Sequence, residues 1–142
     1  MKNNSKEKIL VTGCAGFIGM HLSKALLDIG YEVIGVDNLN SYYDVKLKND
    51  RLLNLKNYKN FNFIKVDISC KEDFENIFKN HYIDKVVNLA AQAGVRYSLE
   101  NPNSYIESNV LGFMNVLDCC RHYNIKGLIY ASSSSVYGGK KK

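Results

Sequence analysis

Three glycines spaced three residues apart, Gly13, Gly16 and Gly19, constrain this chain more than any other feature of its sequence. They follow a short apolar run at residues 9–12, and they open a segment at 17–29 whose apolar residues recur at helical spacing. In a strand–loop–helix of this kind, glycines permit a tight turn, a close approach of a pyrophosphate to the backbone, and close packing of the helix on the sheet. The pattern therefore predicts a dinucleotide pyrophosphate site at the start of the first helix.

The rest of the chain alternates strand and helix patterns. Further strands are predicted at 32–36, 62–66, 85–89 and 127–131, and further helices at 47–55, 71–80 and 102–122, the last beginning with Asn101 as its cap and Pro102 as its first residue. Strands that alternate with helices predict a parallel sheet covered on both faces, and right-handed crossovers leave few topologies. We therefore predict an α/β fold, a doubly wound parallel sheet of the Rossmann type with strand order 3-2-1-4-5, forming one domain over residues 1–142.

An acidic residue, Asp37, ends the second predicted strand. A carboxylate at this place accepts hydrogen bonds from the hydroxyls of an adenosine ribose. Since no arginine stands near Asp37 in the sequence to accommodate a 2′-phosphate, the pattern favours NAD over NADP. The alternative is a plain turn and helix with Asp37 as an ordinary loop residue, which the combination of strand, glycines and acid disfavours.

Composition excludes several other classes of function. The net charge is +5, but Lys140, Lys141 and Lys142 supply three of those charges, and the remaining charges are interleaved, so we expect no nucleic-acid partner. No apolar run approaches the ~20 residues of a membrane span, and the polar N-terminus has no signal-peptide pattern, so we expect a cytoplasmic protein without membrane contact. The cysteines fit neither a zinc pattern nor a redox motif, which predicts reduced, small buried thiols and no metal site: they are Cys14, Cys70, Cys119 and Cys120.

Longer stretches resemble one family, the extended short-chain dehydrogenase/reductases, and within it the NAD-dependent epimerase/dehydratase group. The glycine spacing, the run 37–40 followed by Tyr42-Tyr43-Asp44, and the runs 88–98 and 131–138 are similar to those of UDP-glucuronate 4-epimerases. The resemblance covers residues 9–138. It implies a role in nucleotide-sugar metabolism, and through it in polysaccharide biosynthesis, with NAD as the cofactor.

The resemblance also implies a role for each matching position. The pyrophosphate would lie on Gly13, Gly16, Phe17, Ile18 and Gly19, the adenosine ribose on Asp37 and Asn38, the adenine between Asp67 and Ile68, and the nicotinamide beside Leu89, Ala90, Ala91 and Gln92, with Asn109 near the cofactor. Ser133 would be the catalytic hydroxyl that binds the reacting oxygen of the sugar, and Ser134, Ser135 and Arg96 would bind the substrate. Asp67 has a second interpretation as the cap of the helix at 71–80, and residues 90–94 and 132–135 as plain loops.

The family reaction implied for this chain interconverts UDP-glucuronate and UDP-galacturonate through transient oxidation at C4. It needs a tyrosine base whose pKa is lowered by a lysine one helical turn away. Tyr137 and Lys141 have this spacing, but they fall in a turn after the last strand. We therefore expect an N-terminal fragment that stops before the Tyr-x-x-x-Lys helix, the sixth strand and the substrate domain, and that is inactive alone.

Two other functions remain open from the sequence. One is a stand-alone dinucleotide-binding fragment without turnover. The other is a nucleotide-sugar dehydratase or reductase, although family dehydratases carry an acidic residue where this chain has Ser134 and Ser135. By resemblance the helix at 102–122 is a candidate surface for a homodimer, and the last strand is expected to form an exposed edge of the sheet.

Overall fold

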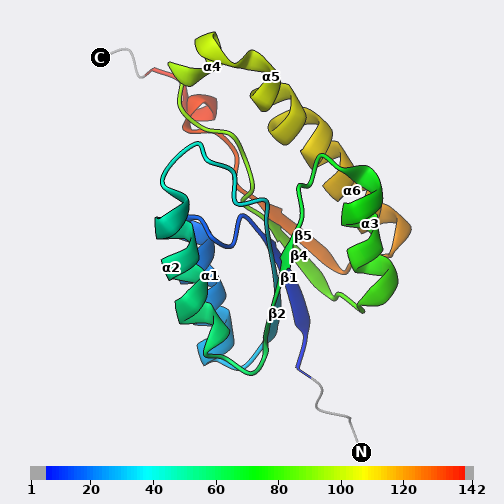
Figure 1. Ribbon diagram of the computed structural model, residues 1–142. Coiled ribbons are helices and arrows are strands. Elements are labelled where there is room, and N and C mark those ends of the chain that lie inside the picture. The colour runs from blue at the N-terminus through cyan, green and yellow to red at the C-terminus, as the bar shows by residue number, and fades with distance from the viewer. Residues whose placement is uncertain (1–5, 140–142) are drawn as a thin grey trace, which may run out of the picture.

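The computed structural model describes residues 6–139 and has the alternating order that the sequence predicts (Figure 1). The strands are β1 (Lys8–Thr12), β2 (Glu32–Asp37), β3 (Phe61–Lys65), β4 (Lys85–Asn88) and β5 (Gly127–Tyr130). The helices are α1 (Phe17–Asp28), α2 (Val45–Lys56), α3 (Lys71–Asn80), α4 (Tyr97–Glu100), α5 (Pro102–Tyr105), the π-helix η1 (Ile106–Gly112), α6 (Phe113–His122) and the 3₁₀ helix η2 (Ser134–Tyr137).

All paired strands are parallel, and their order is β3-β2-β1-β4-β5, which confirms the predicted doubly wound sheet. The central strand β1 is buried on both faces, as its continuous apolar sequence requires. Ile9 and Val11 contribute to the core on one side of the sheet, whereas Leu10 contributes to the core on the other. This alternation follows from the period of two along a strand.

Two layers of helices cover the two faces of the sheet (Figure 1). Helices α1 and α2 pack on one face around Leu27, Leu52 and Leu55, and helices α3 and α6 pack on the other around Phe74 and Val116. The buried apolar face of α3, which the helical spacing predicts, is confirmed. Both layers leave the carboxyl ends of the strands open, and the loops that follow β1, β2, β3 and β4 meet there.

The predicted long helix is helical over its whole length, but its middle is a π-helix and a separate short helix, α4, precedes it. Asn101 caps α5 as predicted, since its side-chain oxygen accepts a hydrogen bond from the Ser104 amide. The wider π turn changes which residues face the sheet. Gly112, Asn115, Val116 and Cys119 are buried. Several apolar residues of the same run are exposed instead, namely Ile106, Val110, Leu111, Met114 and Leu117.

Two other expectations need correction. Asp67 is not the cap of α3, because the cap position is Cys70 and the helix begins at Lys71. Cys14 and Cys119 are buried thiols, as expected, but Cys70 is exposed and Cys120 is half-buried. Over residues 6–139 no cluster of metal-ligating side chains is found, and no helix in that range is long and apolar enough to cross a membrane.

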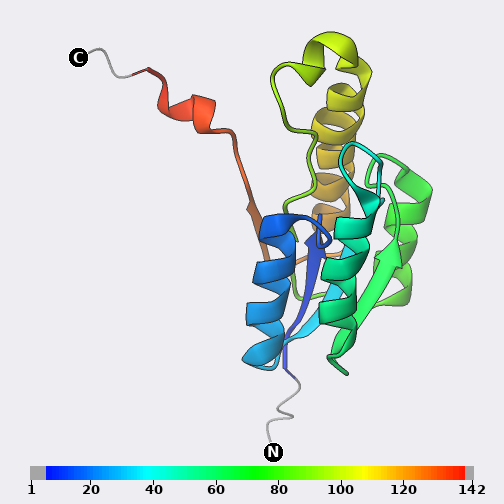
Figure 2. The same ribbon diagram turned by 60° about the vertical axis from the view of Figure 1, so that its left-hand side comes forward.

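Strand β5 forms an edge of the sheet, as predicted, because it pairs with β4 alone among the described strands. The side chains of Ile129 and Tyr130 are exposed on it. Beyond β5 the chain leaves the body of the domain and carries η2 away from the sheet (Figure 2).

Candidate functional site

A hollow lies over the carboxyl ends of the central strands, at the point between β1 and β4 where the strand order changes direction. Ligands of open doubly wound sheets bind in this crevice, because the crossovers on its two sides run to opposite faces. The loops after the first four strands line it, and their lining residues include Gly13, Gly16, Phe17, Ile18, Gly19, Asp37, Asn38, Asn40, Asp67, Ile68, Leu89, Ala90, Ala91 and Gln92. The structure thus brings together residues that are up to 118 positions apart in the chain, from Gly13 to Ala131.

The glycine loop packs too tightly for side chains. Gly13 has a φ of 70°, and a Cβ atom there would lie 2.9 Å from the backbone nitrogen of Ala90. A Cβ atom on Gly19 would lie 2.0 Å from the carbonyl oxygen of Gly13. The cap of α1 is Gly16, so no side chain caps the first amides of the helix, and no acidic residue lies in its first turn. These amides and the positive end of the helix suit an anionic group.

Asp37 holds the glycine loop as well as lining the hollow. Its carboxylate accepts hydrogen bonds from the backbone amides of Ala15, at 3.1 Å, and Leu39, at 2.9 Å. The second contact supports Leu39, which has a positive φ of 55°. Asp37 is buried, so its carboxylate is fixed in place. The spacing from the glycines predicts a ribose contact for Asp37, but it gives no sign of this structural role.

Thr12, which the sequence analysis missed, joins the glycine loop to the loop after β4. Its hydroxyl donates to the side-chain oxygen of Asn88 at 2.6 Å and accepts from the amides of Leu89 and Ala90, each at 3.1 Å. Both Thr12 and Asn88 are buried. The only signal in the sequence is a hydroxyl residue at the end of an apolar strand, directly before Gly13.

The side of the hollow formed by the loop after β3 carries a fixed carboxylate. Asp67 accepts hydrogen bonds from the side-chain nitrogen of Asn38, at 2.7 Å, and from the backbone and hydroxyl of Ser69, at 2.9 and 2.7 Å. Burial alone would raise the pKa of Asp67, but these hydrogen bonds together hold the pKa below its ordinary value. The ionised carboxylate of Asp67 can therefore accept hydrogen bonds at the edge of the hollow.

Helix α2 carries two cations that were not predicted, Lys48, which lines the hollow, and Arg51, which binds residues beside it. The ammonium group of buried Lys48 donates to the backbone and side-chain oxygens of Asn40, at 2.9 and 2.8 Å, and lies 4.5 Å from the ring centre of Tyr43. Arg51 donates to the Tyr43 hydroxyl at 3.1 Å and to the carbonyl of Ala15 at 3.3 Å. Burial lowers the pKa of Lys48, and the Asp37 carboxylate offsets only part of this effect. The signal in the sequence is the helical spacing that puts Lys48 and Arg51 on one side of α2.

The loop after β4 is held from the long helical run. Asn109 in η1 accepts a hydrogen bond from the backbone amide of Gln92, at 2.8 Å, and donates to the Gln92 carbonyl, at 2.9 Å. Asn109 is not among the residues that line the hollow, so it acts on the hollow through Gln92, which is buried.

Of the predicted substrate residues, Ser133 and Arg96 are not among those that line the hollow. Ser133 is exposed and follows β5, and Arg96 is exposed before α4. Ser134 and Ser135 begin η2, and their side chains lie outside the part that the structure describes. Tyr137 is 86% exposed and lies in the 3₁₀ turn, as the sequence predicts, while Lys141 is beyond the described residues.

The chain is similar to a known protein family and to individual proteins over nearly its whole length. Residues 10–142 match the family described as GDP-mannose 4,6 dehydratase. The chain is 59% identical to Protein CapI of Staphylococcus aureus over 92% of this chain and 39% of that protein. It is 48% identical to a UDP-glucuronate 4-epimerase of Thermodesulfobacterium geofontis, over 92% of this chain and 41% of the relative.

Among solved structures, the chain resembles the UDP-glucuronic acid 4-epimerase of Bacillus cereus in complex with UDP-glucuronic acid and NAD. The TM-score is 0.85 at 38% sequence identity, and the match covers 95% of this chain and 43% of that one. The chain therefore spans about two-fifths of the length of the relatives it matches.

Proposed function

Because this chain belongs to the GDP-mannose 4,6 dehydratase family, within the extended short-chain dehydrogenase/reductases, we propose that it is the NAD-binding portion of a UDP-glucuronate 4-epimerase. The observation that carries the proposal is the hollow itself. It combines the glycine loop, with its uncapped helix start, and the buried carboxylate of Asp37 at one switch point of the sheet. These two features suit two neighbouring parts of an adenosine diphosphate group, the anionic pyrophosphate and the ribose diol.

The residues present fit a dinucleotide along the whole hollow. The pyrophosphate would lie on the amides of Phe17 and Ile18, where Gly13 leaves no side chain in the way, and the adenosine ribose would bind Asp37. Asp67 and Ile68 would face the adenine. The nicotinamide would lie beside the loop from Leu89 to Gln92.

When bound, NAD would supply a hydride acceptor and donor for C4 of the sugar. The protein's part here is to fix the cofactor. Thr12 keeps the glycine loop and the loop after β4 at a constant separation, and Asn109 holds Gln92. Ser133 is proposed to bind the reacting oxygen of the sugar, with Ser134, Ser135 and Arg96 on the substrate side.

For these 142 residues alone we propose cofactor binding without turnover. Tyr137, which has a lysine four residues later in the sequence, lies in a 3₁₀ turn. A lysine lowers the pKa of a tyrosine base when both lie on one face of an α-helix. Incubation of the chain with NAD⁺ and UDP-glucuronate, followed by separation of the sugar nucleotides, should give no UDP-galacturonate, and formation of this product would contradict the proposal.

A binding experiment tests the cofactor assignment. The unmodified chain should prefer NAD⁺ to NADP⁺, since a 2′-phosphate would meet the Asp37 carboxylate. Asp37→Ala should reduce that preference at least about tenfold, because hydrogen bonds to a charged group contribute roughly 1.5–3 kcal/mol. The matched control is Asp50→Ala, which removes an exposed carboxylate from α2 and should leave the preference unchanged. An equal NAD⁺ to NADP⁺ ratio in the two variants would mean that Asp37 does not face the ribose.

We also propose a homodimer through the long helical run. Ile106, Val110 and Met114 are four residues apart and 58–60% exposed, and Leu117 lies near them in sequence. Sedimentation should show a dimer that Val110→Asp converts to a monomer, because a charge in an apolar contact is costly. Leu53→Asp, at an exposed apolar position of α2, is the control and should leave the dimer intact.

A further inference from the structure

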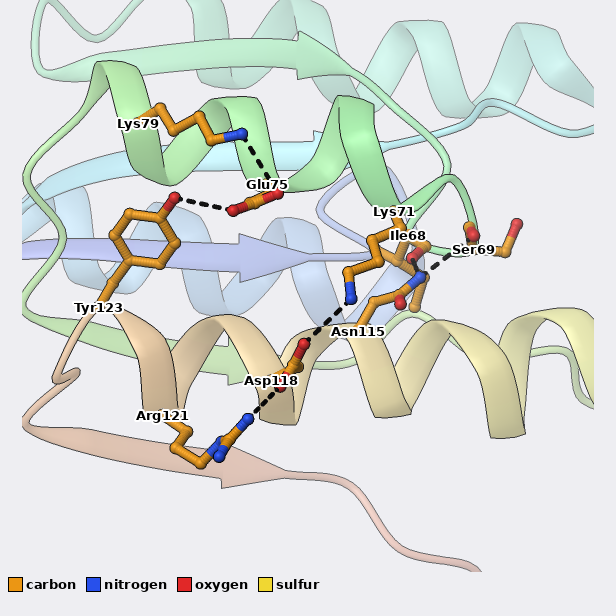
Figure 3. A network of polar contacts seen from close by, with 9 residues as sticks. All are labelled: Ile68, Ser69, Lys71, Glu75, Lys79, Asn115, Asp118, Arg121 and Tyr123. Atoms are coloured by element: carbon orange, nitrogen blue, oxygen red, sulfur yellow. Dashed lines mark hydrogen bonds and ion pairs between the residues drawn. The ribbon is translucent and has the colours of Figure 1, made fainter.

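Helix α6 reaches the loop after β3 through one buried side chain. The amide nitrogen of Asn115 donates to the carbonyl oxygens of Ile68, at 2.8 Å, and Ser69, at 3.1 Å (Figure 3). Asn115 is only 5% exposed. The side-chain amide nitrogen of Asn115 has two hydrogens, and it donates both to two consecutive carbonyls of this loop.

Gly112, three residues earlier, brings the helix close to the same loop. A Cβ atom on Gly112 would lie 2.6 Å from Cγ1 of Ile68, which is nearer than side-chain carbons pack. Ile68 is 4% exposed and lines the hollow. The side chain of Ile68 is therefore fixed from behind by Gly112, and its backbone is fixed by Asn115.

The same loop sets the direction of the Asp67 carboxylate. Ser69 donates to Asp67 from both its amide and its hydroxyl, and the carbonyl of Ser69 is one of the two acceptors of Asn115. A shift of Ser69 would thus turn the carboxylate that faces the hollow. The geometry of Asp67 and Ile68 depends on a residue that lines no part of the hollow, since Asn115 is absent from its lining.

The other polar contacts on α3 and α6 lie within one helix or join side chains of the two helical segments. Asp118 pairs with Lys71 and with Arg121, and Glu75 pairs with Lys79 and accepts from Tyr123 (Figure 3). The charged ends of these lysines and of Arg121 are exposed, and exposed pairs of this kind contribute little to stability. Asn115 is buried and contacts the loop backbone rather than the neighbouring helix, so it fixes the hollow more than the packing of the two helices.

We infer that Asn115, together with Gly112, is a positioning residue for the recognition of an adenine base. The inference rests on the proposed function, in which Asp67 and Ile68 face the adenine. Adenine presents a donor amine beside an acceptor ring nitrogen, and a carboxylate followed by a backbone amide is complementary to that edge. Both hydrogen bonds to the adenine form only when the Asp67 carboxylate and the Ile68 amide keep a fixed separation. Asn115 holds the backbone that follows these two groups.

The same helical run holds the opposite side of the hollow, because Asn109 holds Gln92 in the way described above. Asn109, Gly112 and Asn115 follow one another at intervals of three residues along η1 and the start of α6. One stretch of helix therefore fixes the adenine side and the nicotinamide side relative to each other.

The test compares NAD⁺ with its hypoxanthine analogue, in which a carbonyl replaces the amine and the ring nitrogen becomes a donor. A site that hydrogen-bonds an amine rejects an analogue lacking it, so the ratio of the two dissociation constants reports the geometry of Asp67 and Ile68. Asn115→Leu removes the two donors at similar volume, and Gly112→Ala displaces Ile68 without removing a hydrogen bond. Asp118→Asn is the control, because it weakens the contact between α3 and α6 and leaves Ile68 untouched.

Asn115→Leu and Gly112→Ala should each lower the preference for NAD⁺ over the analogue by about tenfold, because displacement of Asp67 and Ile68 loses roughly one hydrogen bond to the adenine edge. Asp118→Asn should keep the wild-type ratio. Loss of affinity for both ligands by the same factor in Asn115→Leu and Gly112→Ala would overturn the inference, because it would show a structural effect alone.

Absence of dinucleotide binding in the unmodified chain would refute the proposed function, and hydrogen exchange of the unliganded proteins would then decide the inference. Asn115→Leu should speed the exchange of the Ser69 and Cys70 amides, which bond to Asp67, at least about tenfold relative to Asp118→Asn. Equal exchange rates in the two variants would overturn the positioning role.

Discussion

Gly19→Ala should separate the role of the glycine loop from ordinary helix propensity. In the interior of a helix, alanine in place of glycine stabilises by about 1 kcal/mol. Here the added Cβ atom would lie 2.0 Å from the carbonyl oxygen of Gly13, 2.8 Å from its carbonyl carbon and 2.9 Å from the Cα atom of Cys14. All three are backbone atoms, so the loop must retreat by about 1 Å before the closest contact reaches 3.0 Å.

The glycine loop has little room for that movement, because Gly13 itself packs closely on the loop after β4. A Cβ atom added to Gly13 would lie only 2.9 Å from the Ala90 nitrogen. Overpacking of this kind costs roughly 1–3 kcal/mol, of which the helix propensity returns about 1 kcal/mol. We expect a net loss of up to about 2 kcal/mol in the free energy of unfolding, which lowers Tm by up to roughly 8 °C in a domain of this size. NAD⁺ should bind at least about tenfold more weakly, since the displaced amides no longer meet the pyrophosphate.

Thermal unfolding followed by circular dichroism, and calorimetric titration with NAD⁺, measure the two effects. Gly127→Ala is the matched control, because a Cβ there would lie 3.9 Å from Cγ of Lys85, an ordinary contact. The control should keep its affinity and its Tm, or gain slightly from the smaller entropy of the unfolded chain. Equal affinity and equal Tm in the two alanine variants would mean that Gly19 is not held in close contact with the backbone of Gly13.

Three further predictions concern the core and the walls of the hollow. Phe74→Ala should cost about 3–5 kcal/mol in denaturant unfolding, because Phe74 is fully buried between α3 and the sheet, and a loss below about 1 kcal/mol would contradict this packing. Lys48→Gln should weaken NAD⁺ binding about fivefold by releasing Asn40, whereas Lys46→Gln, at an exposed position of the same helix, should not. The pKa of Asp67 is lower in the folded than in the unfolded chain, so its stabilising effect is present above about pH 4 and is lost as the pH falls through the folded value. Asp67→Asn should therefore unfold with a weaker dependence on pH below about pH 4, and an unchanged acid profile would contradict the assignment.

The sequence predicts the sheet well because local signals agree along the chain. The apolar runs, the glycine loop and Asn101-Pro102 each mark an element, and right-handed crossovers then leave few ways to order the strands. The residues after β1 and β2 could be expected to lie together at one edge of the sheet, because the spacing of the glycines and Asp37 reflects a single local geometry.

In the long helical run, the spacing of apolar residues does not predict which side chains are buried. Apolar residues at Ile106, Val110 and Met114 have the spacing of a buried α-helical face, yet the structure exposes them. The π-helix from Ile106 to Gly112 changes the number of residues per turn, so a pattern read with an α-helical period assigns the wrong face. Gly112 and Asn115 are buried instead, and neither has an apolar side chain that the pattern could detect.

Contacts between segments far apart in the chain could not be predicted from the sequence either. Thr12 lies 76 residues from Asn88, and Asn115 lies 47 residues from Ile68. A hydroxyl or amide at such positions has no local signature, because its partner is set by the packing of a helix or strand that comes much later in the chain. Lys48 was missed for a similar reason, since its target, Asn40, is in a loop whose path depends on β2 and α2 together.

The central claim is that the hollow at the switch point holds NAD, and amide chemical-shift mapping of the unmodified chain during titration with NAD⁺ tests it most directly. We expect the largest shifts on amides from Gly13 to Gly19, on Asp37, on Ile68 and on Gln92, and no shifts on the surface around Asn60 and His81. Absence of shifts at saturating NAD⁺, or shifts gathered around Asn60 and His81 instead, would contradict it.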